Sequence, residues 1–78
     1  FLLDNNFSIY PNPVSDIITI KLKKLDSAEI QIFDVNGQLI KEFLASNNYK
    51  LDVSKLSNGV YFIGFNKNAL LRYKFIKQ

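Results

Sequence analysis

The sequence predicts a small all-β domain, an antiparallel sandwich of the immunoglobulin type. Apolar and polar side chains alternate with a period of two along most of the chain, which is the pattern of half-buried strands. The alternating runs are short, recur about every ten residues, and are separated by turn residues, so we expect about seven strands. No convincing helical stripe is present. A small β-barrel is the alternative architecture.

The first half of the chain contains three of these runs. A polar lead-in precedes a short predicted strand at residues 7–10. The run at residues 16–23 places Ile18, Ile20 and Leu22 on one face, and the run at residues 28–34 does the same with Ile30 and Ile32. We expect these five aliphatic side chains to face the core.

Four runs follow, at residues 38–44, 49–53, 60–66 and 70–77. The run at 60–66 is apolar on both sides, which predicts a central strand. The last run alternates Tyr73 and Phe75 with polar neighbours such as Lys74, and we expect it to form an edge of its sheet.

Turn residues set the connections. Asp34, Asn36 and Gly37 predict a tight hairpin, because Asp favours the start of a type I turn and Gly adopts a left-handed conformation readily. Residues 67–69 predict a second tight link. The looser segment 44–48 is the expected crossing between the two sheets.

Two prolines flank Asn12 directly before a convincing strand. Pro lacks a backbone N–H and also keeps the preceding residue out of the helical region. We therefore expect Pro11, Asn12 and Pro13 to follow an extended, polyproline-like path, which lets one strand leave a sheet and the next begin in the other.

A second distinctive stretch contains Leu56, Gly59 and Tyr61. This spacing is typical of a tyrosine corner, in which the phenol hydrogen-bonds to nearby backbone. Gly59 supplies the permissive φ before the strand begins. We expect Tyr61 to be structural rather than catalytic.

The composition argues against catalysis and cofactors. The 78 residues form a single domain and include no His and no Cys, which excludes Ser–His or Cys–His nucleophiles and His/Cys zinc sites. Asp34 and Asn36 resemble the start of a calcium loop, but the further ligands are missing. We expect solvated carboxylates on the strands, at Asp16, Glu29, Glu42 and Asp52.

The surface chemistry leaves two questions open. The net charge of +3 is spread along the chain, which favours solvated lysines over a nucleic-acid site. Phe33 and Phe62 fall off the main core face in the alternation and could stack on sugars, although we expect core or edge packing for both.

Taken in order, the stretches YPNPVSDIITI, IQIFDVNGQLI and LDVSKLSNGVYFIGF, ending in RYKFIKQ, carry a family resemblance. The chain resembles the C-terminal sorting domains of cargo proteins of the type IX secretion system of Bacteroidetes, over residues 7–78. The motif positions that the resemblance implies are Pro11, Asn12, Pro13, Asp34, Gly37, Leu39, Leu56, Gly59, Tyr61, Lys74 and Lys77.

The resemblance implies a small immunoglobulin-like, non-catalytic secretion signal. Its parent would pass through the periplasm and then be secreted or displayed on the cell surface. The implied partners are an outer-membrane translocon and a sortase-like peptidase that commonly removes the domain. Because the chain starts at Phe1 rather than Met, we expect an upstream cargo, with residues 1–6 as the end of a linker and 7–78 as the sorting domain.

The mechanism we expect is recognition of the last strand. An edge strand carrying Lys74 and Lys77 can accept a partner strand, and its cations can steer toward an acidic surface. The same edge would support a homodimer in isolation. The alternative function is an accessory module that binds carbohydrate or a surface protein and stays on the mature product.

Overall fold

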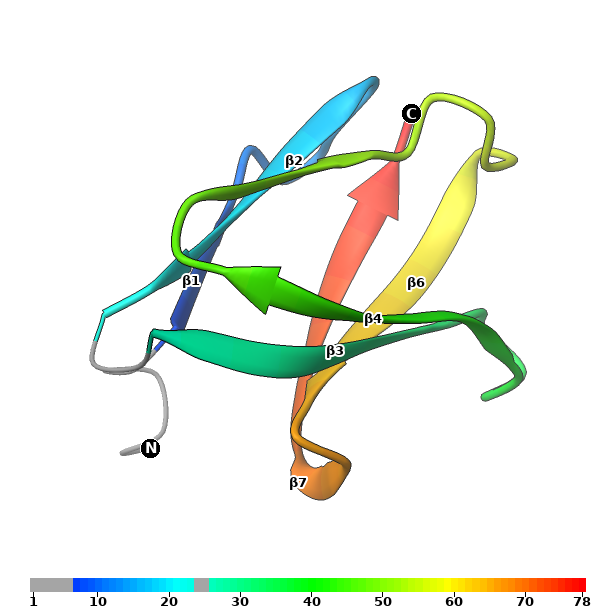
Figure 1. The fold of residues 1–78 in the computed structure, drawn as a ribbon. Helices are drawn as coiled ribbons and strands as arrows, with labels where there is room; N and C mark the ends of the chain where they lie inside the picture. Colours follow the sequence, from blue (N-terminus) through cyan, green and yellow to red (C-terminus); the bar gives the residue numbers. More distant parts are fainter. Residues whose placement is uncertain (1–6, 24–25) are drawn as a thin grey trace.

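The computed structural model describes residues 7–23 and 26–78, which fold into two sheets facing one another (Figure 1). Within these residues there are seven strands: β1 Phe7–Tyr10, β2 Ile17–Leu22, β3 Ser27–Phe33, β4 Leu39–Ser46, β5 Tyr49–Asp52, β6 Gly59–Phe65 and β7 Asn68–Lys77. The sandwich prediction is confirmed, and the barrel alternative is wrong because the sheets are separate. No helix in the described part of the chain could span a membrane.

Every strand pairing is antiparallel. One sheet has the order β1-β2-β5 and the other has the order β4-β3-β6-β7. The central position of β6 and the edge position of β7 are both as predicted. The chain crosses between the sheets at Asn47 and Asn48, inside the predicted segment, although the link is a tight turn rather than a loose one.

The core lies between the sheets and is built from the inward side of each strand. The predicted faces are confirmed, since the five aliphatic residues of β2 and β3 named above are buried. Aromatic rings join the two layers: Phe7 of β1 stacks on Phe65 of β6, with ring centroids 3.8 Å apart. Among the side chains that the structure describes, the remaining buried apolar residues are Val14, Ala28, Ala45, Leu51, Val53, Tyr61, Ile63 and Phe75.

The expected role of the proline segment is wrong. β1 and β2 belong to the same sheet and pair with each other, with Tyr10 opposite Thr19, so the chain does not change sheets there. The segment bends at Asn12 and Pro13 instead of running extended, and both X–Pro peptide bonds are cis. The alternation of apolar and polar residues on either side of the prolines could not reveal that the chain stays in one sheet, because the pattern does not specify which strands pair with each other.

The second tight link also differs slightly from the prediction. The turn lies at Asn66 and Lys67, one residue earlier than expected, and both have positive φ, 53° and 57°. Two successive positive φ values are the signature of a type I′ hairpin, whose twist matches that of the flanking strands. Asn tolerates this region well, which explains why the turn can form without glycine.

Candidate functional site

The three family-like motifs lie at one end of the sandwich, which we call the motif end: residues 11–16, 34–38 and 53–58 with the end of β7. In the three-stranded sheet, Tyr10 pairs with Thr19 and Ile17 with Asp52, so residues 11–16 and 53–58 share an end. In the four-stranded sheet, the pairing of Gly59 with Lys77 and of Phe33 with Phe62 places residues 34–38 at the same end of the sheet as the end of β7, with β6 between them.

Asn12 joins these two ends through its side chain. Its amide Nδ2 donates to the carbonyl of Lys74 at 3.1 Å, and its Oδ1 accepts from the backbone N–H of Ile76 at 3.0 Å. A single side chain therefore satisfies one acceptor and one donor on the outer edge of β7. Pro11 and Pro13 are exposed on either side of it.

Val14 continues the same contact with its backbone. Its N–H donates to the carbonyl of Ile76 and its carbonyl accepts from the N–H of Gln78, both at 2.8 Å, as an isolated parallel bridge. The Val14 side chain is buried in the core. Residues 12–14, which we call the strap, thus cover the outer edge of β7 from Lys74 to Gln78.

The strap changes the expectation for the terminal strand. β7 is an edge in the sheet order, but the backbone groups that a partner strand would need at its C-terminal end are already bonded to the strap. Strand addition there would require the strap to leave. The expected partner-strand contact is therefore not supported over residues 74–78.

The two predicted terminal lysines differ in exposure. Lys74 is exposed, with its side chain on the outward face of the sheet. Lys77 retains only 7% of its surface, and its Nζ donates to the carbonyl of Gln78 at 2.9 Å. The expectation of a steering charge at Lys77 is wrong, because the strand alternation turns this side chain to the inward face together with Phe75.

The hairpin motif is organised by one carboxylate. Asp34 Oδ1 accepts from the N–H of Asn36 and of Gln38, each at 2.9 Å, and the Asp34 carbonyl accepts from the N–H of Gly37. Gly37 has φ +82°, as predicted. Leu39 follows and faces outward, 49% exposed, opposite Phe33.

The third motif forms the predicted tyrosine corner. The Tyr61 hydroxyl donates to the carbonyl of Ser57 at 2.6 Å, and its ring stacks on Phe75 with centroids 5.5 Å apart. Leu56 packs against the core. Gly59, with φ +150°, occupies a conformation that L residues rarely adopt.

The aromatic pair Phe33 and Phe62 lies outside the core, against our expectation of core or edge packing. Both are half-buried on the outward face of β3 and β6, the two central strands, where they are directly opposite each other. The Arg72 guanidinium carbon lies 3.9 Å from the Phe33 ring centroid. Sequence alternation placed both rings off the core face correctly, but it carries no signal for Arg72 as their partner.

The carboxylates show no catalytic arrangement in the part of the chain that the structure describes. Among those residues no group of three acidic, His or Cys side chains could hold a metal ion. Hydrogen bonds from the side chain and from the N–H of Ser54 hold the pKa of the Asp52 carboxyl below its usual range. This exposed turn carboxylate has a local structural role.

The sequence of the chain matches the model of a known protein family. The sequence model of the secretion system C-terminal sorting domain matches residues 8–78. The chain belongs to this family. The resemblance to sorting domains of the type IX secretion system is thereby confirmed, whereas a search of curated proteins found no match.

Membership defines the general role of the sorting domain. It is a C-terminal signal that works with a secretion machinery on behalf of an upstream cargo, and its parent is secreted or exported to the cell surface. Sorting domains of this kind are generally non-catalytic. The sequence reasoning missed the strap, because Val14 and Gln78 have no motif signal and their pairing spans nearly the whole chain.

Proposed function

We propose that this domain directs its parent protein through the type IX translocon of the outer membrane, after transit through the periplasm, and that a sortase-like peptidase then removes it. The domain itself performs no chemistry and carries no cofactor. The linker to the cargo is residues 1–6, which lie outside the described residues, and the signal is residues 7–78.

The observation that carries this proposal is the family match over residues 8–78. The motif end supports it physically. The strap bonds the first motif to the end of β7, and the Asp34 turn and the Tyr61 corner each fix the shape of their own segment. A translocon can therefore read a rigid three-dimensional surface of a folded domain, in which the exposed members Pro11, Pro13, Leu39 and Lys74 are available for contact.

We also propose that the isolated domain self-associates through an edge strand, but not through β7. β4 forms the other edge of the four-stranded sheet and is eight residues long. Its outward Leu39 and Leu44 are exposed. Because long edges with apolar side chains favour pairing, a dimer of the isolated domain would use β4 rather than the strapped β7.

The experiment is a reporter fusion in a host with a working type IX system. The reporter carries an N-terminal export signal and the full chain at its C-terminus. We expect it in the medium or on the cell surface, and we expect it to stay in the periplasm when the chain is omitted or the translocon is deleted. Export that is independent of the chain would overturn the proposal.

Intact-mass analysis of the exported reporter tests removal. A mature product that lacks residues 7–78 supports cleavage upstream of the domain. A product that retains them contradicts the peptidase step and favours the accessory module. A sugar could not stack on the face of Phe33 that the Arg72 guanidinium occupies. Deleting residues 73–78 is a poor test, since it removes Phe75 from the core.

A further inference from the structure

The outward face of the four-stranded sheet carries several apolar side chains among its polar ones. Leu39, Leu44 and Ile76 are exposed there, and Phe33 and Phe62 are half-buried beside them. The outward face of the three-stranded sheet exposes Tyr10 and Ile17 beside Lys21, Lys50 and Asp52. An apolar patch on one face of a small domain marks an interaction surface more often than chance exposure.

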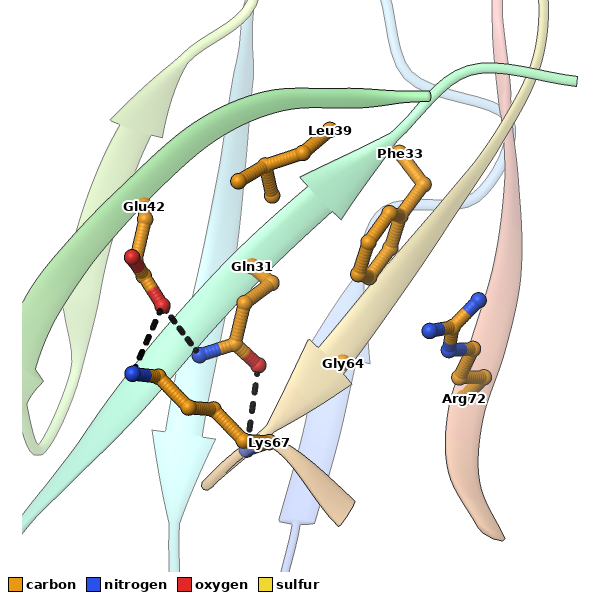
Figure 2. Close-up of a pocket in the computed structure, with 7 residues that line it drawn as sticks. All are labelled: Gln31, Phe33, Leu39, Glu42, Gly64, Lys67 and Arg72. Atoms are coloured by element: carbon orange, nitrogen blue, oxygen red, sulfur yellow. Dashed lines mark hydrogen bonds and ion pairs between the residues drawn. The ribbon is translucent and has the colours of Figure 1, made fainter. Parts of the chain in front are cut away.

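A hollow of about 350 Å³ lies in this face (Figure 2). Its floor is Gly64 of β6, where an added Cβ would lie 3.2 Å from Cε2 of Phe33 and 3.4 Å from Oε1 of Gln31. The missing side chain is thus what creates the depression. Phe33 and Leu39 supply apolar walls.

A buried amide holds one side of the hollow in place. Gln31 retains only 4% of its surface, and both ends of its amide are bonded: Nε2 donates to Glu42 Oε2 at 3.1 Å, and Oε1 accepts from the N–H of Lys67 at 3.2 Å. The Lys67 ammonium lies 3.8 Å from Glu42 Oε2 (Figure 2). The Glu42 charge is therefore already balanced.

The opposite side of the hollow carries a cation, and a second one follows it along β7. Arg72 lies over Phe33, and Lys74, the next outward residue of β7, is opposite Phe62. Among the residues that the structure describes, neither of them forms an ion pair with a carboxylate. The hollow thus combines an apolar depression with Arg72 on its rim, and Lys74 continues the positive charge along the outward face of β7. This arrangement complements an apolar side chain flanked by carboxylates.

We propose that this hollow docks a protein segment that presents an apolar anchor side chain followed by acidic residues, and that the segment belongs to the secretion machinery. The anchor lies over Gly64 between Phe33 and Leu39, and the carboxylates pair with Arg72 and Lys74. The identity of the partner rests on the proposed sorting function. Protein is favoured over lipid because central apolar pockets with Arg at the rim are typical of protein interfaces.

Two surface substitutions with matched controls test the docking in the reporter fusion described above. Lys74→Glu reverses a charge two residues along β7 from Arg72, on the same outward face, and Lys21→Glu makes the same change on the other sheet. Leu39→Ser removes an apolar wall that is 49% exposed, and Ile17→Ser removes a comparable residue, 43% exposed, on the other sheet. All four side chains are exposed, and thermal unfolding of each purified variant verifies that it folds.

We expect export to fall at least about tenfold for Lys74→Glu and for Leu39→Ser, and to stay unchanged for both controls. Wild-type levels of export for both Lys74→Glu and Leu39→Ser would overturn the docking site while leaving the sorting function intact. Failure of the wild-type fusion to be exported would instead overturn the sorting function and the partner assignment together.

A second measurement separates a protein from a lipid surface. The purified chain is mixed with anionic phosphatidylglycerol vesicles and sedimented. We expect no difference between wild type, Lys74→Glu and Lys21→Glu. Vesicle binding that is lost only in Lys74→Glu would identify an anionic membrane as the occupant and overturn the assignment to a protein segment.

Discussion

Asn12 Oδ1 accepts a hydrogen bond from the backbone N–H of Ile76 at 3.0 Å, across 64 residues of sequence. This contact and its companion to the Lys74 carbonyl join a loop of the three-stranded sheet to the edge of the four-stranded sheet. The proline-flanked Asn12 therefore has a structural purpose: it closes the edge of the C-terminal strand that would otherwise be open to other chains.

Replacing Asn12 by alanine removes both contacts. We expect the free energy of unfolding to fall by about 1–2 kcal/mol, because each partly exposed hydrogen bond contributes about 0.5–1.5 kcal/mol. Urea unfolding measures the loss. Hydrogen exchange at the Ile76 amide should accelerate more than at Ile63, which is in the sheet centre.

Two further variants control for the loss of an exposed asparagine. Asn12→Asp keeps the acceptor for Ile76 but loses the donor to Lys74, so its stability should be intermediate. Asn58→Ala changes an exposed residue of the neighbouring loop and should have little effect. Equal stability of Asn12→Ala and Asn58→Ala would show that the strap contributes nothing.

Tyr61→Phe tests the tyrosine corner. The substitution keeps the ring stacked on Phe75 and removes only the hydroxyl that donates to the Ser57 carbonyl at 2.6 Å. We expect a loss of about 1 kcal/mol, because the bond is lost while the apolar packing stays. Tyr10→Phe, at an exposed position, is the control in the same thermal unfolding series, and a similar change in both would contradict the corner's role.

Much of this fold was predictable because it depends on local patterns. Alternation identifies Ile18, Ile20 and Leu22 as core residues, since only one face of a pleated strand can be buried. The Asp34–Gly37 turn and the Tyr61 corner were also predictable, because their bonds span four residues or fewer. In each case the sequence contains both partners of the interaction within a short window.

Contacts between distant segments were not predictable in the same way. The strap pairs Val14 with Lys77, and no local pattern specifies that pairing. Alternation places Lys77 on the same face as Phe75, but its burial was not expected, because a lysine at the end of a strand is ordinarily solvated. The hollow at Gly64 also arises from cross-strand neighbours, Gln31 and Phe33, that only the register brings together.

Gly37→Ala isolates the cost of a left-handed backbone. Gly37 has φ +82°, and an added Cβ would meet nothing within 4 Å, so no steric clash with other residues contributes. We expect a loss of about 1–2 kcal/mol in the free energy of unfolding. Gly37→Asn should lose less, because Asn tolerates this conformation. If chemical unfolding shows that Gly37→Ala is at least as stable as Gly37→Asn, the explanation by backbone conformation is contradicted.

Ser54→Ala tests the electrostatics of the loop that follows β5. The Ser54 side chain and its N–H hydrogen-bond to Asp52 and hold the pKa of that carboxyl below its usual range. Removing the hydroxyl should raise the pKa part of the way back, because the N–H of residue 54 still donates at 2.8 Å in the native turn. A carboxyl ¹³C NMR titration measures the change, with the exposed Ser57→Ala as the control.

The same substitution should also alter the pH dependence of stability. Because the pKa of Asp52 is lower in the folded state than in the unfolded chain, the ionised carboxylate stabilises the fold. That stabilisation is fully present above the unfolded value of about 3.9 and is lost as the pH falls through the folded value. Ser54→Ala should therefore unfold with a weaker dependence on pH below about 4 than the wild type. An unchanged slope, together with an unchanged Asp52 pKa, would show that the serine hydroxyl does not stabilise the charge.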